Sequence, residues 1–344
     1  MTFNRDILVF VALALVWGSS FAAIEVGLES LPPIFFAALR FDVAAALFAV
    51  AVVAFGYQWR PRTRTDWALI AIGGFLLIGA HFALLFVGQS YVSSAVAAIV
   101  LSLLPIVTPA FALLLLPRQR IRLPTVLGLL LGLAGVVLIA LDGGSLDGQA
   151  IGVGLLALSA ITFALGSVLT ERLRGTLPVV SLQAWSMALG ALVLHTLSAV
   201  HPAESLATVE VTLAAVGALA YLSVVATAAG FFVYFTLLER LGATELSLVN
   251  YAVPIVAALV GWALLGESLT LVTVAGFGLI VLGFTLCKLE AVWTLLAPIV
   301  RRRRDRRPTG TAERTRVVSD GGERQPRRSS SRPDAEGCYS PCDD

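Results

Sequence analysis

Two charged residues, Arg40 and Asp42, lie inside a long apolar run, in the stretch AALRFDVAAAL at 37–47. A charge at the centre of a membrane helix costs about 2.5–3.5 kcal/mol, so charged side chains there normally face a bundle interior or water. Arginine suits recognition of an anionic group such as a carboxylate, and aspartate suits proton transfer. If this run spans a membrane, we expect Arg40 to recognise the substrate and Asp42 to carry a coupling proton.

Helix geometry places these two side chains on different faces. Consecutive residues turn by about 100°, so Arg40 and Asp42 are separated by about 200° and do not simply neutralise each other. A structural role is the alternative, in which Arg40 bonds backbone carbonyls or Glu25 and only fixes the fold. Both roles fit the pattern.

Further polar or aromatic side chains inside apolar runs are candidates for lining a pathway. Trp17 lies too deep in its run for an interfacial aromatic belt, and His81 can titrate near neutral pH. For each of these candidates, packing or interhelical hydrogen bonding is the alternative role. For the Glu25 carboxylate, the alternative is a position at the membrane interface. These additional candidates are Trp17, Ser20, Glu25, His81, Asn250 and Tyr251.

Three prolines, Pro105, Pro109 and Pro254, lie within apolar runs. Proline removes a backbone donor and disturbs the helix around it. We predict that these residues are bending points for alternating access, with passive kinks as the alternative.

The composition is that of a membrane protein. Of the 344 residues, 58% are hydrophobic and 13% charged, whereas soluble domains have about 45–50% apolar and about 25% charged residues. Since a membrane helix needs about 20 apolar residues, we predict an all-α polytopic membrane protein with ten transmembrane helices. The expected spans lie near 6–27, 33–56, 66–88, 93–116, 124–141, 151–171, 179–199, 212–238, 244–266 and 269–290.

The loop charges predict the orientation of these spans. Loops 57–65, 117–123, 172–178 and 239–243 carry arginines, whereas the alternate loops carry no Lys or Arg. By the positive-inside rule, both termini are expected in the cytoplasm, with the chain in the cell membrane.

The spans form two similar sets. SLLPIVTPAFALLLL (102–116) aligns with YAVPIVAALVGWALL (251–265), and LGLLLGLAGVVL (127–138) aligns with AGFGLIVLGFTL (275–286). Because five spans is an odd number, the second copy enters the membrane in the opposite orientation, a common plan for secondary transporters. We predict five-helix repeats at 1–141 and 142–290.

Two stretches, WGSSFAAIEVGLESLPPIFFAALRF (17–41) and GATELSLVNYAVPIVAALVGWALLGESLT (242–270), resemble EamA-type members of the drug/metabolite transporter superfamily. The resemblance covers about residues 6–290. It implies a ten-helix carrier of two inverted five-helix repeats that moves small metabolites or drugs outward, often amino acids. The first repeat departs from the second, because it has Pro117-Arg118 where the second has Gly266-Glu267.

We predict a secondary transporter that exports small organic metabolites, amino acids among them, or drugs by alternating access, with the proton as coupling ion. The sequence has no GxxxxGK[ST] loop for ATP. It also has no HExxH motif or clustered metal ligands of the kind that a membrane-embedded enzyme would need. A channel or facilitator for small solutes is the alternative. No cofactor, metal or catalytic residue is expected.

The tail at 291–344 is rich in Arg, Ser, Pro, Gly and acidic residues, which predicts disorder. Its first basic cluster, Arg301–Arg307, follows the last span and attracts anionic lipid, at about 1 kcal/mol per basic residue. The expected partners are therefore a small-molecule substrate and the lipid bilayer, with no nucleic acid, and a homodimer is compatible with the pattern.

Overall fold

The computed structural model describes residues 2–116, 123–141, 148–202, 204–205, 207 and 209–287, and all of its regular elements are helical. The first-half elements are α1 (Thr2–Leu28), α2 (Pro33–Ala54), α3 (Arg64–Ala71), the π-helix η1 (Ile72–Ala80), α4 (His81–Gln89), α5 (Ser94–Leu101), α6 (Leu104–Leu115) and α7 (Leu123–Ala140). The second-half elements are α8 (Gly148–Arg172), α9 (Val179–Val200), α10 (Leu213–Ala220), η3 (Tyr221–Ala229), α11 (Gly230–Leu241), α12 (Ala243–Leu246), α13 (Val249–Val260), η4 (Gly261–Leu265) and α14 (Leu271–Cys287). The predicted tail and its lipid-binding cluster Arg301–Arg307 lie outside the described residues.

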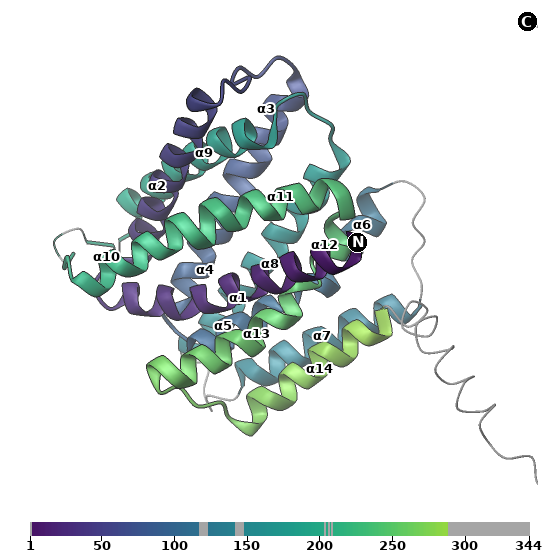
Figure 1. Cartoon of the computed structure of the whole chain (residues 1–344). Coiled ribbons are helices and arrows are strands. Elements are labelled where there is room, and N and C mark those ends of the chain that lie inside the picture. The colour runs from purple at the N-terminus through teal and green to yellow at the C-terminus, as the bar shows by residue number, and fades with distance from the viewer. Residues whose placement is uncertain are drawn as a thin grey trace, which may run out of the picture. The chain divides into compact units, whose positions relative to one another are not determined.

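Within the residues that the structure describes, eight helical stretches are long and apolar enough to cross a membrane. They coincide with eight predicted spans, so the prediction of an all-α polytopic membrane protein is confirmed (Figure 1). The predicted fifth and tenth spans coincide with α7 and α14, whose apolar stretches Val126–Ala140 and Leu271–Gly283 are shorter.

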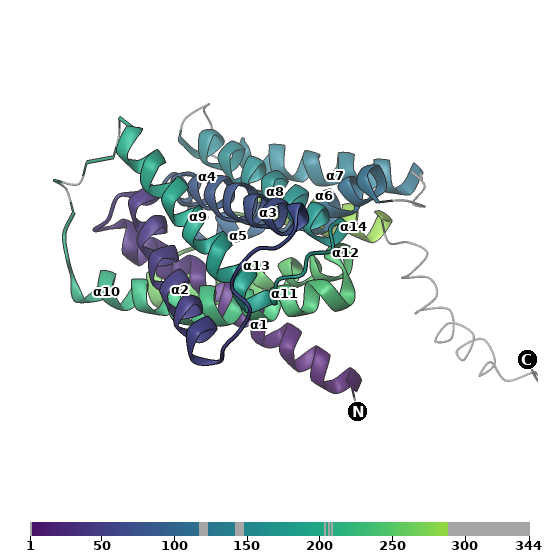
Figure 2. The same ribbon diagram turned by 90° about the horizontal axis from the view of Figure 1, so that it is seen from above.

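Helix packing is duplicated between the two halves. α1 packs on α13 as α8 packs on α6, and α2 packs on η3 as α9 packs on η1. α2 also packs on α9, and α7 lies beside α14, as Figures 1 and 2 show. Each of these contacts is therefore found again when both spans are replaced by their equivalents in the other half, five spans away along the chain.

Wide helical turns occur at matching places in the two halves. The spacing that aligns Pro105 with Pro254 also aligns the start of η1, Ile72, with the start of η3, Tyr221. In η3 the Gly230 N–H bonds the carbonyl of Val225, five residues earlier. π-helical turns are rare and often occur at functional sites, and both segments adjoin the cavity described below.

Carboxylates from one half of the chain meet the N-terminal end of a helix in the other half. Asp66 accepts hydrogen bonds from the Thr176 N–H at 2.6 Å and the Leu177 N–H at 3.3 Å, just before α9 begins. In the opposite direction, Glu204 of the second half accepts from the Ile34 N–H at 2.6 Å and the Phe35 N–H at 3.0 Å, at the start of α2. These contacts supply partners for donors that helix starts leave unpaired.

A third carboxylate has no counterpart at the aligned position. Glu267 accepts from the Ser94 N–H at 2.9 Å and the Ala95 N–H at 3.3 Å, where α5 begins. The first half has an arginine, Arg118, in place of this acid. At the start of α12, the acceptor comes from the same half of the chain. The Glu171 carboxylate, at the end of α8, accepts from the Ala243 N–H at 2.8 Å.

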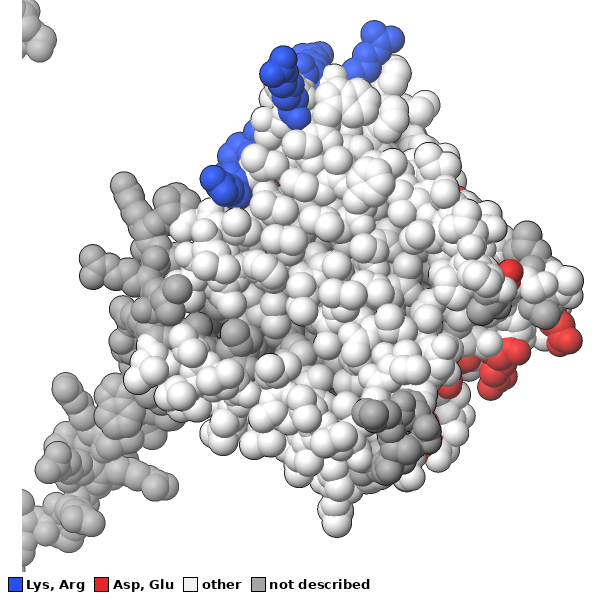
Figure 3. All heavy atoms as spheres, turned by 180° about the vertical axis from the view of Figure 1, so that it is seen from behind, with Lys and Arg blue, Asp and Glu red and all other residues white. Residues whose placement is uncertain are grey.

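Surface charge separates along the bundle. In Figure 3, the visible Lys and Arg side chains gather at one end and the Asp and Glu side chains at the opposite end. The loop 57–63 and the first residue of α3 carry exposed arginines. The loops before α2 and α10, joined by a hydrogen bond from the Glu210 N–H to the Ser30 carbonyl at 3.0 Å, carry exposed Glu29 and Glu210. We call these two ends the basic end and the acidic end.

Glycines allow close contact between α7 and α14. A Cβ on Gly276 would lie 2.8 Å from the Gly135 carbonyl oxygen, and one on Gly135 would lie 2.5 Å from the Gly276 carbonyl oxygen. Backbone atoms cannot give way as a side-chain tip can, so the two helices would have to separate. Close approach through small residues is a usual basis of membrane-helix packing.

We expect Gly276→Ala to destabilise the protein by about 1–3 kcal/mol, because overpacking pushes α7 and α14 apart. Thermal unfolding in detergent measures the effect. Gly278→Ala is the matched control, since a Cβ there meets nothing within 4 Å; it should be neutral or slightly stabilising. Equal unfolding temperatures for the two variants would contradict this account of the contact.

Candidate functional site

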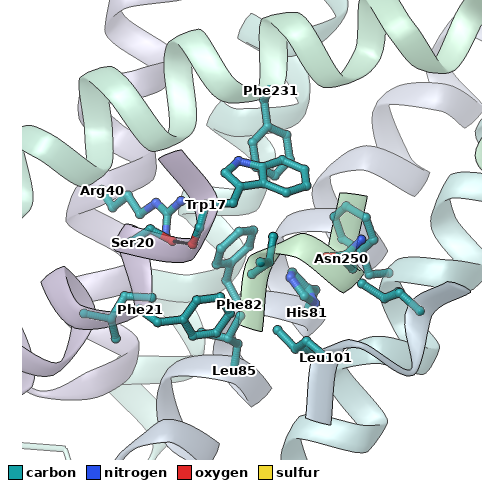
Figure 4. Close-up of a pocket in the computed structure, with 14 residues that line it drawn as sticks. Trp17, Ser20, Phe21, Arg40, His81, Phe82, Leu85, Leu101, Phe231 and Asn250 are labelled. Carbon is teal, nitrogen blue, oxygen red and sulfur yellow. Dashed lines mark hydrogen bonds between the residues drawn. The ribbon is translucent and has the colours of Figure 1, made fainter. Parts of the chain in front are cut away.

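A small cavity lies among helices of both halves, and most of its walls are apolar or aromatic (Figure 4). Its volume is about 50 Å³, well below the roughly 300–1,000 Å³ of typical small-molecule sites. A metabolite would therefore fit only after helices move apart. The lining residues are Trp17, Ser20, Phe21, Ile24, Arg40, His81, Phe82, Leu85, Leu101, Leu104, Phe163, Phe231, Asn250 and Val253.

Arg40 is directed into this cavity by the buried face of α2. It is only 2% exposed, and its neighbours Ala37, Phe41 and Ala44 are fully buried. Its guanidinium lies 4.7 Å from the centre of the Phe82 ring, and its Nε donates a hydrogen bond to the hydroxyl of Thr227 in η3. Cation–π contact stabilises a desolvated guanidinium by about 2 kcal/mol.

No carboxylate among the described residues lies within 4.0 Å of Arg40. The suggested structural partner, Glu25, instead accepts a hydrogen bond from Gln89 Nε2 at 3.3 Å. A buried charge without a counter-ion is costly, and an aromatic ring with one hydroxyl offsets only part of that cost. The arrangement can bind an anionic group that enters the cavity.

His81 begins α4 directly after η1 and is 4% exposed. Its Nδ1 lies 3.0 Å from the carbonyl oxygen of Ser159. The Ser159 hydroxyl lies 2.7 Å from the same nitrogen and donates its own proton to the His81 carbonyl at 2.9 Å, so both Ser159 oxygens are placed to accept from a protonated Nδ1. In this tautomer, Nε2 of the neutral ring is an acceptor. Nε2 has no hydrogen-bond partner within the described chain.

Asn250, Ser20 and Trp17 complete the polar lining. Asn250 Nδ2 donates to the Ser247 carbonyl at 3.1 Å, and its side-chain oxygen has no donor among the residues described. The Ser20 hydroxyl donates to the Trp17 carbonyl at 2.7 Å. The Trp17 indole donates to the Ala226 carbonyl at 3.2 Å and lies 5.3–6.5 Å from three other aromatic rings. The cavity thus combines one cation with several acceptors.

Three other candidates lie outside the cavity lining. Asp42 bonds His195 Nε2 at 2.7 Å, and the two side chains are 45% and 39% exposed, on the α2–α9 face. Glu25 lines a separate hollow at the acidic end, and Tyr251 is half-buried beside the lining residue Asn250. The sequence therefore placed Asp42 correctly on a different face from Arg40, but the structure does not bring it to the cavity.

Only one of the three prolines adjoins a break between helices; the other two lie inside a helix. Pro105 is the second residue of α6 and follows the turn at Ser102 and Leu103 that separates α5 from α6. Pro109 lies inside α6, and Pro254 lies inside α13. Bending at these positions during transport stays a prediction.

The aromatic walls and the hydroxyl partners are the part of the site that sequence reasoning missed. Phe82, Phe163 and Phe231 are ordinary members of apolar helices, and Thr227 is one of several threonines in the chain. Thr227 faces Arg40 because of the π-helical turn of η3. A search of the sequence for the 3.6-residue period of an α-helix does not detect such a turn.

The chain is similar to known transporters along most of its length. Residues 4–141 and 150–288 each match the model of the EamA-like transporter family. An uncharacterized transporter of Archaeoglobus fulgidus is 31% identical over 78% of this chain and 92% of its own. The uncharacterized inner membrane transporter YedA of Escherichia coli K12 is 30% identical, with 84% and 92% covered.

Two further matches concern function and fold. A probable amino-acid metabolite efflux pump of Salmonella typhimurium is 29% identical, over 81% of this chain and 93% of its own. One solved structure superposes with a TM-score of 0.59 at 22% identity, covering 84% of this chain and 98% of that one. The second match supports the fold alone.

We expect Thr227→Val to destabilise the protein by about 1–3 kcal/mol, because it leaves the Arg40 Nε–H buried without an acceptor. Chemical or thermal unfolding in detergent measures this. Thr236→Val is the control, since the Thr236 hydroxyl bonds only the carbonyl one turn before it, at 2.7 Å. If both variants unfold alike, the Thr227 hydroxyl does not support Arg40.

Proposed function

This chain belongs to the EamA-like transporter family, and we propose that it exports small organic metabolites that carry a carboxylate, amino acids among them. The observation that carries the proposal is the buried Arg40 guanidinium, which has no carboxylate partner among the described residues. A bound carboxylate would supply the missing charge through charge-assisted hydrogen bonds.

Other groups of the cavity can bind the ammonium group and the side chain of an amino acid. His81 Nε2 and the Asn250 side-chain oxygen are acceptors for an ammonium group, and Trp17 and Phe82 offer apolar surface to a side chain. The similarity to a probable amino-acid metabolite efflux pump of Salmonella typhimurium supports this choice. A drug without an anionic group would leave Arg40 unpaired.

We propose alternating access between two inverted repeats, 1–141 and 142–290, as the mechanism. The duplicated helix contacts and the matching wide turns of η1 and η3 support this proposal. The cavity draws residues from both proposed repeats and is too small for a metabolite, as expected of a state closed on both sides. Pro105, Pro109 and Pro254 are the proposed bending points.

The proposed orientation places the basic end and both termini in the cytoplasm. The gathering of the visible arginines at one end of the bundle supports it (Figure 3). Substrate would then enter from the basic end and leave at the acidic end, past Glu25.

The proposed coupling ion is the proton, with Asp42 as its carrier. The carboxylate of Asp42 shares a hydrogen bond with His195, so the pair has two groups that can exchange a proton. Asp42 lies on the same helix as Arg40, two residues away, and movement of α2 would affect both.

In proteoliposomes, we expect the wild type to exchange radiolabelled leucine or phenylalanine across the membrane by counterflow. Arg40→Gln should reduce this exchange more than about tenfold, because losing one member of a buried charge pair costs about 2–5 kcal/mol. Arg172→Gln, at an exposed arginine, should exchange like the wild type. Normal exchange by a correctly reconstituted Arg40→Gln protein would refute the carboxylate site, and net flux without counterflow would indicate a pore.

For coupling, Asp42→Asn should keep counterflow but lose stimulation by an imposed pH gradient, because the amide cannot carry a proton. His195→Gln tests the partner in the same way, and uptake is compared with and without the gradient. Unchanged stimulation in the Asp42→Asn variant would remove Asp42 from the coupling step.

A further inference from the structure

An apolar groove of about 630 Å³ lies between α2 and α9, on the same side of the molecule as Asp42 but toward the basic end. Small side chains line it, among them Ala49 of α2 and Ala184 and Ala188 of α9. This is more than ten times the volume of the central cavity. The groove has room for an elongated apolar group.

One hydroxyl in the groove points to a ligand with a polar part. Ser181 lines the groove, is fully buried, and its Oγ has no hydrogen-bond partner in the part of the chain that the structure describes. Buried hydroxyls nearly always have a partner. Ser181 is the third residue of α9 and so lies near the end of a membrane-crossing helix, at the depth where apolar chains give way to polar groups.

The rim of the groove is aromatic and cationic. The Trp185 indole donates to the Trp59 carbonyl at 2.7 Å, and the two rings stack with centres 6.5 Å apart. This contact holds the loop after α2 against α9. The Arg60 guanidinium lies 4.9 Å from the centre of the Trp59 ring. Exposed Arg62 follows in the same loop, and exposed Arg64 is the first residue of α3.

We propose that this groove binds an anionic phospholipid from the leaflet at the basic end. One acyl chain lies against the alanines, an ester carbonyl accepts a hydrogen bond from Ser181, and the phosphate lies at the Arg60 loop. Charge complementarity selects an anionic headgroup, because basic pockets beside membrane helices on the side of positive loops favour such lipids. Tryptophans at the rim match the headgroup level of a bilayer.

Native mass spectrometry of the full chain, released from detergent with phosphatidylglycerol or phosphatidylcholine, tests the proposal. We expect phosphatidylglycerol to be retained over phosphatidylcholine. Ala49→Leu should reduce retention by filling the groove, whereas Ala46→Leu, one turn earlier at an exposed position outside the groove, should not. Arg60→Gln should reduce the preference for phosphatidylglycerol about fivefold, the factor for one basic residue, and Arg172→Gln should leave it unchanged.

Three outcomes would overturn the proposal. Equal retention by Ala49→Leu and Ala46→Leu removes the groove as the site, and equal retention of the two lipids removes the anionic headgroup. A dimer without retained lipid that Ala49→Leu dissociates would show that a second copy of the chain covers the groove. Retention is measured without transport, so failure of the proposed export function would leave this test intact.

Discussion

The arrangement depends on carboxylates that meet the starts of helices across the two halves of the chain. Apolar surroundings offer no water to the free N–H groups of a helix start, so each start needs an acceptor from the protein. Asp66, Glu204 and Glu267 provide such acceptors from the opposite half. Their hydrogen bonds hold the starts of α2 and α5 and the segment just before α9, and thereby help to position the helices around the cavity.

The same arrangement explains why Arg40 is unusual. The acids at both ends of the bundle accept from backbone groups, so they are engaged away from the cavity. Arg40 lies in the middle, among phenylalanines, with a neutral hydroxyl as its hydrogen-bond partner. The protein thus retains a buried positive charge, and in the function proposed above the carboxylate of the substrate compensates it.

Much of this architecture could be predicted from the sequence. Apolar length predicted the eight long spans, arginine placement indicated the two ends, and helical periodicity separated Arg40 from Asp42. The aromatic walls could not be predicted, because lipid-facing and core-facing positions in a membrane are equally apolar. Phe82 in the cavity and Phe232 on the exterior look alike in sequence. The partners Thr227 and Ser159 depend on wide turns and on long-range packing that no local pattern contains.

The carboxylate contacts between the two halves are distributed unequally over the two ends of the bundle. At the acidic end, Glu204 and Glu267 both tie one half to the other, whereas at the basic end Asp66 does so and Glu171 bonds within its own half. Within the described chain, prying the halves apart at the basic end therefore breaks fewer carboxylate ties than at the acidic end.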